Sequence, residues 1–347
     1  MDTVQKMPHA RINPLNHINY SSYYIYALWQ VLGQDAVEFD TKPFRNLSID
    51  AQMSRGLLFT VEQDGSEAKK FFICGNDSYR IEEEIYEWCD VYASVNANFE
   101  KTPKRKKLVS LAPSFGIRLW SIGGTVLAAL ANSIHYLKAA HDRKIKTFLG
   151  NYKRLLNRPF YSDLTPEPSR SDYVFFCSTL WYNDEYNQND LNVNARRANF
   201  IRACKSIEGI RFEGGFVPQP GRSSLDLFSD CISPVSYPYK TWLQKTKQSS
   251  LVFNTPAFWD CHGWKLGEYL ALGKAILSTS LSNNLPAPLT HGVNIHFVNT
   301  DIESIKSAIS YIIEHPDYKE HLEQGAREYW ETYGTPEKSL ELIGIHQ

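Results

Sequence analysis

Two acidic side chains with seven residues between them, Asp260 and Glu268, are the first candidates for chemistry in this sequence. The spacing places Asp260 in a loop and Glu268 in the second turn of the helix that follows. A carboxylate accepts hydrogen bonds from a vicinal diol, so Glu268 suits a ribose and Asp260 suits the hydroxyls of a second sugar beyond a diphosphate. Lys265, near the start of the helix, suits the charge of that diphosphate.

The same residues also have a purely structural interpretation. An Asp near a helix N-terminus is a good cap, and a Glu in an early turn complements the helix dipole. Lys265 equally suits a solvated helix surface. The surroundings favour a binding site, because Gly263 and Gly267 flank the lysine and Gly273-Lys274 returns the chain to a strand.

The elements that must position these residues lie within residues 250–278. An apolar run of strand character is followed by a polar loop with Asp260 and His262, an amphipathic segment from Gly263, and a second strand after Gly273. This order is one β-α-β unit. In such units ligands bind outside the carboxyl ends of the strands, near the free N–H groups of the helix N-terminus. Both acids are expected at that edge of the sheet.

This stretch, SLVFNTPAFWDCHGWKLGEYLALGKAILS, resembles the donor site of GT-B glycosyltransferases. That family carries an E-x7-E motif, a helix of small residues and a return strand of the type Gly-(Lys/Thr)-Pro-Val. Asp260 stands at the first Glu of the motif, Glu268 at the second, and EYLALGKAIL matches the rest. The resemblance is strong over these residues, loose over the C-terminal half and thin over the N-terminal half. It implies a GT-B fold, with two Rossmann-like, doubly wound, parallel-sheet α/β domains facing a cleft.

The resemblance implies an enzyme of the hexosyltransferase type. It would move a sugar from a nucleoside diphosphate sugar to a hydroxyl acceptor, a saccharide or lipid-linked saccharide in surface glycan synthesis. The nucleotide sugar is then a substrate, and no cofactor is expected. No D-x-D motif occurs in a loop that would suit a metal-bound diphosphate, so the resemblance also predicts metal independence.

Further donor-binding candidates lie outside the β-α-β unit. Arg196 and Arg197 follow a predicted strand end by one or two helical turns and could share the diphosphate charge. Tyr239 closes residues 236–239, which lie where relatives use a loop to enclose the base. The predicted donor-binding set is Glu268, Lys265, Gly263, Arg196, Arg197 and Tyr239.

His17 is the candidate base of the N-terminal half. It lies in the loop after the first predicted strand, and in inverting GT-B enzymes a His in the corresponding loop deprotonates the acceptor hydroxyl. A lone loop His is also commonly a hydrogen-bonding surface residue. With Asp260 it forms the predicted catalytic pair. Because no other His follows an N-terminal strand end, the stereochemical outcome stays open.

Two rival functions fit the same donor motif. A GT-B-fold sugar-nucleotide epimerase shares the donor site but needs additional acids in both domains. A catalytically silent subunit that binds glycans or nucleotides would explain why Asp260 stands where the family has Glu. Consumption of a nucleotide sugar without any acceptor separates the epimerase from the transferase.

Length and composition are those of an ordinary globular protein. A chain of 347 residues suits two domains. Residues 157–172, with three prolines, predict the linker. The expected divisions are an acceptor-side domain over 1–160, a donor domain over 161–335 and a C-terminal helix, 336–347, that can return to the first domain. The net charge of −1 names no partner.

The pattern of strands and helices predicts parallel sheets. Strands are expected over 10–15, 36–40, 57–62, 70–74, 91–95, 108–111, 173–180, 211–216 and 293–298, besides the two of the β-α-β unit. Helices are expected over 20–32, 80–88, 193–207, 239–248, 302–314, 317–333 and 336–345, and a loop over 218–230.

A basic excess lies between Lys101 and Arg158, where thirteen basic residues accompany one acid, Asp142, for a local charge of 13 − 1 = +12. Such a run is commonly a solvated helix face. Interleaved Leu, Ile and Phe residues also fit an anionic membrane surface. Nucleic acid is not expected, because no recognised aromatic or zinc motif accompanies the charge.

Cellular location follows from three further features. The six cysteines form no C-x-x-C pair, the N-terminus lacks the apolar core of a signal peptide, and the apolar stretch from Ile122 to Leu130 is too short to span a membrane. We therefore expect a cytoplasmic protein, peripheral at the inner face of the membrane.

Overall fold

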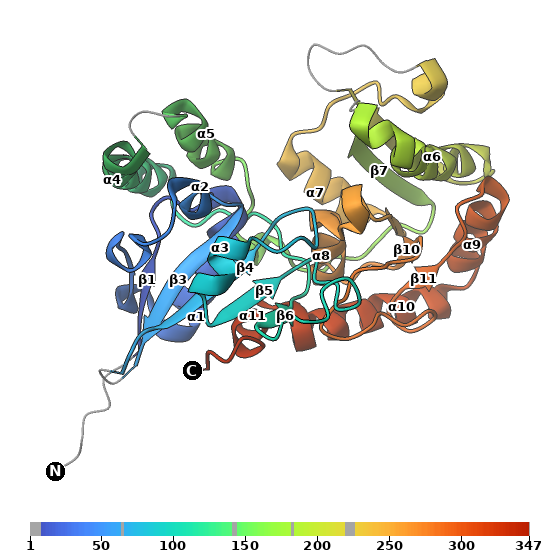
Figure 1. Ribbon diagram of the computed structural model, residues 1–347. Coiled ribbons are helices and arrows are strands. Elements are labelled where there is room, and N and C mark those ends of the chain that lie inside the picture. The colour runs from blue at the N-terminus through green and yellow to red at the C-terminus, as the bar shows by residue number, and fades with distance from the viewer. Residues whose placement is uncertain (1–7, 64–65, 141–143, 182–183, 219–225, 347) are drawn as a thin grey trace. The chain divides into compact units, whose positions relative to one another are not determined.

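The computed structural model describes residues 8–63, 66–140, 144–181, 184–218 and 226–346 (Figure 1). The chain forms two compact units. Unit 1 comprises Met1–Asp163, Asn283–Ala287 and Tyr333–Gln347, and unit 2 comprises Leu164–Ser282 and Pro288–Thr332. Each unit is an α/β structure with its own sheet, which confirms the predicted fold class.

Unit 1 is built on a six-stranded sheet of order β2-β1-β3-β4-β5-β6. All neighbours pair in parallel except β3, which runs antiparallel to both β1 and β4. The sheet is therefore mainly parallel, as predicted, and β3 is its antiparallel exception. Residues 63–68 join β3 to β4 directly, and a connection this short can link only antiparallel strands. The strands are β1 (His9–Ile12), β2 (Val37–Phe39), β3 (Gly56–Glu62), β4 (Lys69–Cys74), β5 (Val91–Ser94) and β6 (Leu108–Ser110).

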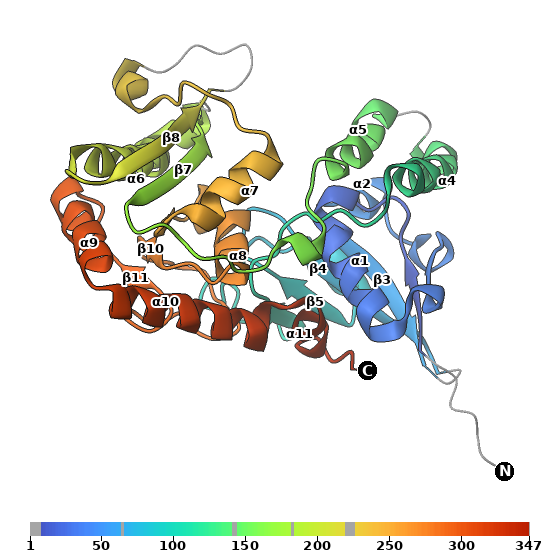
Figure 2. The ribbon, with the colours of Figure 1, turned by 180° about the vertical axis from the view of Figure 1, so that it is seen from behind.

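Helices cover both faces of this sheet. Helix α3 covers one face (Figure 1) and α1 covers the other (Figure 2). Under α3, Leu58 and Phe72 of the sheet pack with Ile85. Gly33 ends α1 at φ 86°, where its N–H bonds to the Trp29 carbonyl. Tyr23 of α1 donates to the Gly334 carbonyl, which ties the C-terminal segment to unit 1. The helices are α1 (Ile18–Leu32), α2 (Ile49–Gln52), α3 (Glu83–Trp88), α4 (Ile122–Ala140), α5 (Ile145–Leu155) and α11 (Pro336–Glu341).

Unit 2 holds two parallel ladders that continue one another. The first pairs β7 (Tyr173–Thr179) with β8 (Arg211–Val217), and the second has the order β11-β10-β9, from His296–Phe297, Ile276–Ser278 and Val252–Asn254. The Ser250 N–H donates to the Tyr173 carbonyl at 2.7 Å. The Ser249 hydroxyl accepts from the Phe175 N–H and donates to the Leu251 carbonyl. A side chain thus replaces a backbone rung between β7 and β9, and the strand order is 8-7-9-10-11.

The core of unit 2 lies between this sheet and its helices. Phe200 of α6 stacks on Phe253 of β9 with ring centres 4.3 Å apart, and Phe176 of β7 packs edge-on against both. These helices are α6 (Asp184–Ser206), α7 (Tyr239–Gln248), α8 (Gly263–Ala271), α9 (Ile302–Glu314) and α10 (Pro316–Tyr329); shorter helical turns are η4 (Asp226–Cys231), η5 (Phe258–Asp260) and η6 (Trp330–Gly334).

Three predicted elements of unit 2 have different bounds. Helix α6 begins at Asp184, whereas the predicted start was residue 193. The start was predicted too late because residues 184–192 are mostly polar and show no apolar periodicity. Strand β11 has two residues, since the chain turns just before it, where the Val293 and Asn294 N–H groups bond to the Thr290 carbonyl. The predicted loop 218–230 ends in η4, and its residues 219–225 lie outside the described part of the chain.

Candidate functional site

The strand order of unit 2 contains a switch point. From β7 the chain passes through α6 to β8 on one side, then crosses back through α7 to β9 on the other side and continues to β10 and β11. The direction of winding reverses between β7 and β9. In open parallel sheets the ligand lies outside the carboxyl ends of the two strands at such a switch point. The segments there are residues 180–181 after β7 and 255–262 after β9.

The segment after β9 holds an unusual backbone. Trp259 and Asp260 both adopt left-handed conformations, with φ of 46° and 61°, and Gly263 follows at φ 69°. Non-glycine residues rarely occupy this region, and each such residue costs about 1–3 kcal/mol. Strain of this kind persists only where the surroundings impose it, and it gathers at functional sites.

Packing holds this loop in place. The Ala257 N–H donates to the Cys261 carbonyl at 2.9 Å, and Cys261 and His262 are buried. From the end of β7, the Trp181 ring packs edge-on against Phe258 with centres 4.6 Å apart. The loops that follow β7 and β9 therefore contact each other at the switch point.

Helix α8 presents Lys265 toward β7. Its ammonium donates to the Cys177 carbonyl and lies 4.8 Å from the centre of the Phe176 ring. The side chain is half-buried. Burial first, and then the positive charge of Arg197, lower the pKa of Lys265 to about 8. The cationic side chains of Lys265 and Arg197 therefore lie close together and partly shielded from water.

Glu268, one turn further along α8, is 4% exposed. Its carboxylate accepts a hydrogen bond from the Tyr239 hydroxyl at 2.6 Å. Its charge acts to raise the pKa of Lys265, and it also contributes to the raised pKa of the buried Tyr269, which Arg197 opposes. These five side chains are therefore close neighbours in one cluster.

The cluster has an excess of positive charge. Arg197 and Lys265 carry +2 together and Glu268 carries −1, and Lys265 lies in the first turn of α8. The positive end of the helix dipole adds to this field. A bound anion would relieve the repulsion that lowers the pKa of Lys265. The arrangement therefore suits a phosphate-bearing ligand.

The structure brings together four of the predicted site residues: Arg197, Tyr239, Lys265 and Glu268. Two details differ from the expectation. Tyr239 begins α7 and is bonded to Glu268, where a loop enclosing a base was expected. Arg196, the neighbour of Arg197 on α6, is partly exposed.

The two predicted catalytic residues lie in different units. Asp260 is on the strained loop of unit 2 and is partly exposed. His17 precedes α1 in unit 1, and its carbonyl accepts from the N–H groups of Tyr20 and Ser21. Burial lowers the pKa of His17 to about 4. Its Nδ1 is buried, and no described group lies within hydrogen-bond distance of it.

Two groups of the site were not predicted from the sequence: the Cys177 carbonyl of β7, and Trp181, which follows β7. A signal for Trp181 was present, because it directly follows the predicted strand 173–180 and so occupies a carboxyl end of the sheet. The contact of Cys177 with Lys265 had no signal, since 88 residues separate them.

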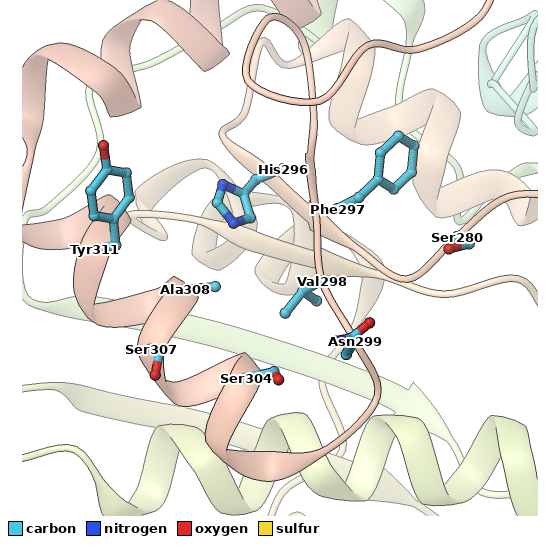
Figure 3. Close-up of a pocket in the computed structure, with 9 residues that line it drawn as sticks. All are labelled: Ser280, His296, Phe297, Val298, Asn299, Ser304, Ser307, Ala308 and Tyr311. Atoms are coloured by element: carbon cyan, nitrogen blue, oxygen red, sulfur yellow. The ribbon is translucent and has the colours of Figure 1, made fainter.

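A cavity of about 440 Å³ opens elsewhere in unit 2, between β11 and α9 (Figure 3). Tyr311 and Ser304 of α9 line one side, and His296 lies opposite, with its Nδ1 2.8 Å from the Tyr318 hydroxyl. Ser280 marks the end near the carboxyl edge of the sheet. Two strand spacings, about 10 Å, separate β11 from β9 at the switch point.

Comparison with solved structures finds distant similarities. The C-terminal domain of a glycosyl transferase group 1 family protein (LpcC) from Francisella tularensis has 11% identity and a TM-score of 0.37, over 50% of this chain and 97% of that domain. A glycosyltransferase from Rickettsia africae has 11% identity and a TM-score of 0.40, over 76% and 67% of the two chains. A UDP-GlcNAc 2-epimerase from Neisseria meningitidis bound to UDP-GlcNAc has 13% identity and a TM-score of 0.36, over 72% and 62%.

Similarities this distant carry no argument about the reaction. No protein-family model matches the sequence. No curated protein matches it. The function is therefore argued from the cluster around Lys265 and the loop around Asp260.

Proposed function

We propose that the protein is a glycosyltransferase of the GT-B kind, which moves a hexosyl group from a nucleoside diphosphate sugar to a hydroxyl acceptor. One observation carries the proposal: Arg197 and Lys265 converge, partly buried, beside the start of α8 at the switch point of a parallel sheet. Unit 2 would hold the donor, with the diphosphate against these two cations and the N–H groups of the first turn of α8.

Glu268 is the proposed partner of the ribose. An ionised carboxylate can accept about four hydrogen bonds, and the Tyr239 hydroxyl supplies one of them. The two oxygens of a carboxylate suit a vicinal diol. Asp260, which the strained loop holds just ahead of α8, is the proposed partner of the transferred sugar.

The reaction needs charge stabilisation and one proton transfer. The bond between C1 of the sugar and the diphosphate oxygen breaks, and its electron pair leaves with the diphosphate, whose charge Lys265 and Arg197 would stabilise. The acceptor oxygen forms the new bond to C1, and its proton passes to a base. His17 is the proposed base, because its low pKa keeps the imidazole neutral at pH 7. A saccharide or lipid-linked saccharide is the proposed acceptor, in a metal-independent, cytoplasmic reaction.

Calorimetric titration with UDP, GDP, ADP, CDP and dTDP, each alone and as a sugar conjugate, tests the donor site. One base should bind well, and the binding should weaken in Lys265→Met. Failure of every nucleotide to bind at millimolar concentration would refute the proposal.

Product analysis then tests the reaction. Release of free nucleoside diphosphate that depends on an added saccharide acceptor is the expected result. Conversion of the nucleotide sugar to an isomer without an acceptor would instead identify an epimerase, and binding without any turnover would identify a silent subunit.

A further inference from the structure

Helix α4 of unit 1 has its polarity reversed relative to an ordinary surface helix. Its buried residues are Thr125, Ala129, Asn132 and Tyr136. Its exposed residues include six large aliphatic side chains: Ile122 (64% exposed), Val126 (49%), Leu127 (68%), Leu130 (59%), Ile134 (56%) and Leu137 (41%). An amphipathic helix of a water-soluble domain normally presents the opposite arrangement.

The six aliphatic side chains form one continuous stripe. At about 100° per residue they fall within a sector of roughly 140° of the helix surface. Single exposed apolar residues are common, but a contiguous apolar patch marks an interaction surface. We refer to these six residues as the α4 stripe.

The buried side of α4 fixes this orientation. The Asn132 side-chain amide donates to the Tyr152 hydroxyl of α5 at 2.8 Å, and the Tyr136 ring stacks on Phe148 of α5 with centres 4.4 Å apart. Rotating the stripe inward would break a buried hydrogen bond and a ring stack. The outward orientation of the stripe is therefore part of the fold of unit 1.

Positive charge is exposed on the helix next to the stripe. Helix α5 lies beside α4 in both views (Figures 1 and 2), and its exposed side carries Lys146, Leu149, Lys153 and Arg154. Lys138 is exposed on α4 itself. Between Lys101 and Phe160 the sequence has one acid, Asp142, which lies with Arg143 outside the described residues. The partner must therefore be apolar in its interior and anionic at its surface.

We propose that the α4 stripe and the cations of α5 dock unit 1 on an anionic lipid membrane. Helix α4 would lie in the plane of the interface with its aliphatic side chains among the acyl chains, while the lysines meet the headgroups. A second copy of the chain fits less well, because a symmetric contact would place like charges against each other. Among the described helices, none is both long and apolar enough to cross a membrane.

The predicted basic excess between Lys101 and Arg158 also includes residues 104–107, which lie outside α4 and α5. Arg105 pairs with Glu83 and stacks over the Tyr86 ring, and the Lys107 ammonium donates to the Tyr86 carbonyl at 2.8 Å. These contacts hold residues 104–107 near α3. That segment supplies a matched control.

Co-sedimentation with vesicles of phosphatidylcholine alone, or mixed with phosphatidylglycerol, tests the proposal. The wild type should pellet with the mixed vesicles at low salt and less as salt rises. Lys146→Gln with Lys153→Gln should weaken binding about 30-fold, from about 1 kcal/mol per lysine. The triple variant Leu127→Ser, Leu130→Ser and Ile134→Ser should lose it, whereas Lys104→Gln with Lys106→Gln should bind like the wild type.

All substituted side chains are exposed, so circular dichroism and melting curves of the variants should match the wild type. A wild type that stays in the supernatant with mixed vesicles at low salt would overturn the proposal. So would a dimer in sedimentation velocity that the triple serine variant abolishes, because the stripe would then bind a second copy. Equal binding by the control and the α5 variants would overturn the role given to α5.

Discussion

Glu268 combines a structural contact with a proposed binding role, and one substitution separates them. In Glu268→Gln the amide oxygen can still accept from the Tyr239 hydroxyl, so the fold should persist. The charge that strengthens hydrogen bonds to a ribose is lost, and each such bond is worth roughly 1.5–3 kcal/mol. We expect nucleotide affinity to fall about 10- to 100-fold by calorimetry. Unchanged affinity in Glu268→Gln would remove this residue from the site.

Lys265 should take up a proton when a diphosphate binds. Burial and Arg197 lower its pKa to about 8, and a bound anion would raise it again. At pH 8 about half of the free protein lacks this proton, whereas at pH 6.5 nearly all of it is already protonated. Calorimetry at pH 8 in buffers of different ionisation enthalpy should therefore detect uptake of up to about half a proton, and affinity should decline as pH rises above 8. Lys265→Met should abolish the uptake, and its persistence in this variant would assign the proton to another group.

His17 makes a prediction about the acid side of the pH profile. Because burial lowers its pKa to about 4, the imidazole stays neutral between pH 7 and pH 5. If it is the base, kcat/KM should stay nearly constant over this range, whereas an imidazole with the ordinary pKa of 6.5 would lose about 30-fold. His17→Ala should reduce turnover by about two to four orders of magnitude. Turnover within a few-fold of the wild type would leave His17 as a structural residue at the start of α1.

At the scale of elements, the turn from η5 into α8 depends on Gly263. Its φ of 69° favours glycine, and an added Cβ would meet no atom within 4 Å. Gly263→Ala should therefore destabilise unit 2 only through the backbone, by about 1–2 kcal/mol, and should displace the N–H groups of the first turn of α8. We expect a small fall in melting temperature with a larger fall in nucleotide affinity. Gly209→Ala, also at positive φ with open space around it but remote along the chain, is the control for stability alone; equal binding losses in both variants would contradict a local effect.

At the scale of the whole molecule, the C-terminal segment from Tyr333 belongs to unit 1 and not to the unit that precedes it. It buries Leu340, Ile343 and Ile345 and accepts the Tyr23 hydroxyl. Deleting residues 333–347 should therefore destabilise unit 1 by several kcal/mol, since each large aliphatic side chain contributes about 1.5–3 kcal/mol on burial. Hydrogen exchange should accelerate in α1 before it does in β7 and β9. Faster exchange confined to unit 2 would contradict this assignment.

The local elements of the site can be predicted from the sequence. Helix bounds at 239–248 and 302–314 and the β-α-β unit over 250–278 were predicted as the structure has them, because apolar periodicity and glycine positions are local signals. The proximity of Lys265 and Glu268 follows from helix geometry alone. The antiparallel direction of β3 also has a local cause, because its connection to β4 is short.

Contacts between residues that are distant in the sequence depend on the packing of whole elements. Three contacts of the site could not be predicted from the sequence: Arg197 with Lys265, Tyr239 with the buried Glu268, and Trp181 with Phe258. Each of them joins elements whose separation depends on the order of strands in the sheet. The same holds for α4. Its apolar residues predict burial, but Asn132 and Tyr136 find their partners on α5, and those long-range contacts fix the apolar face outward.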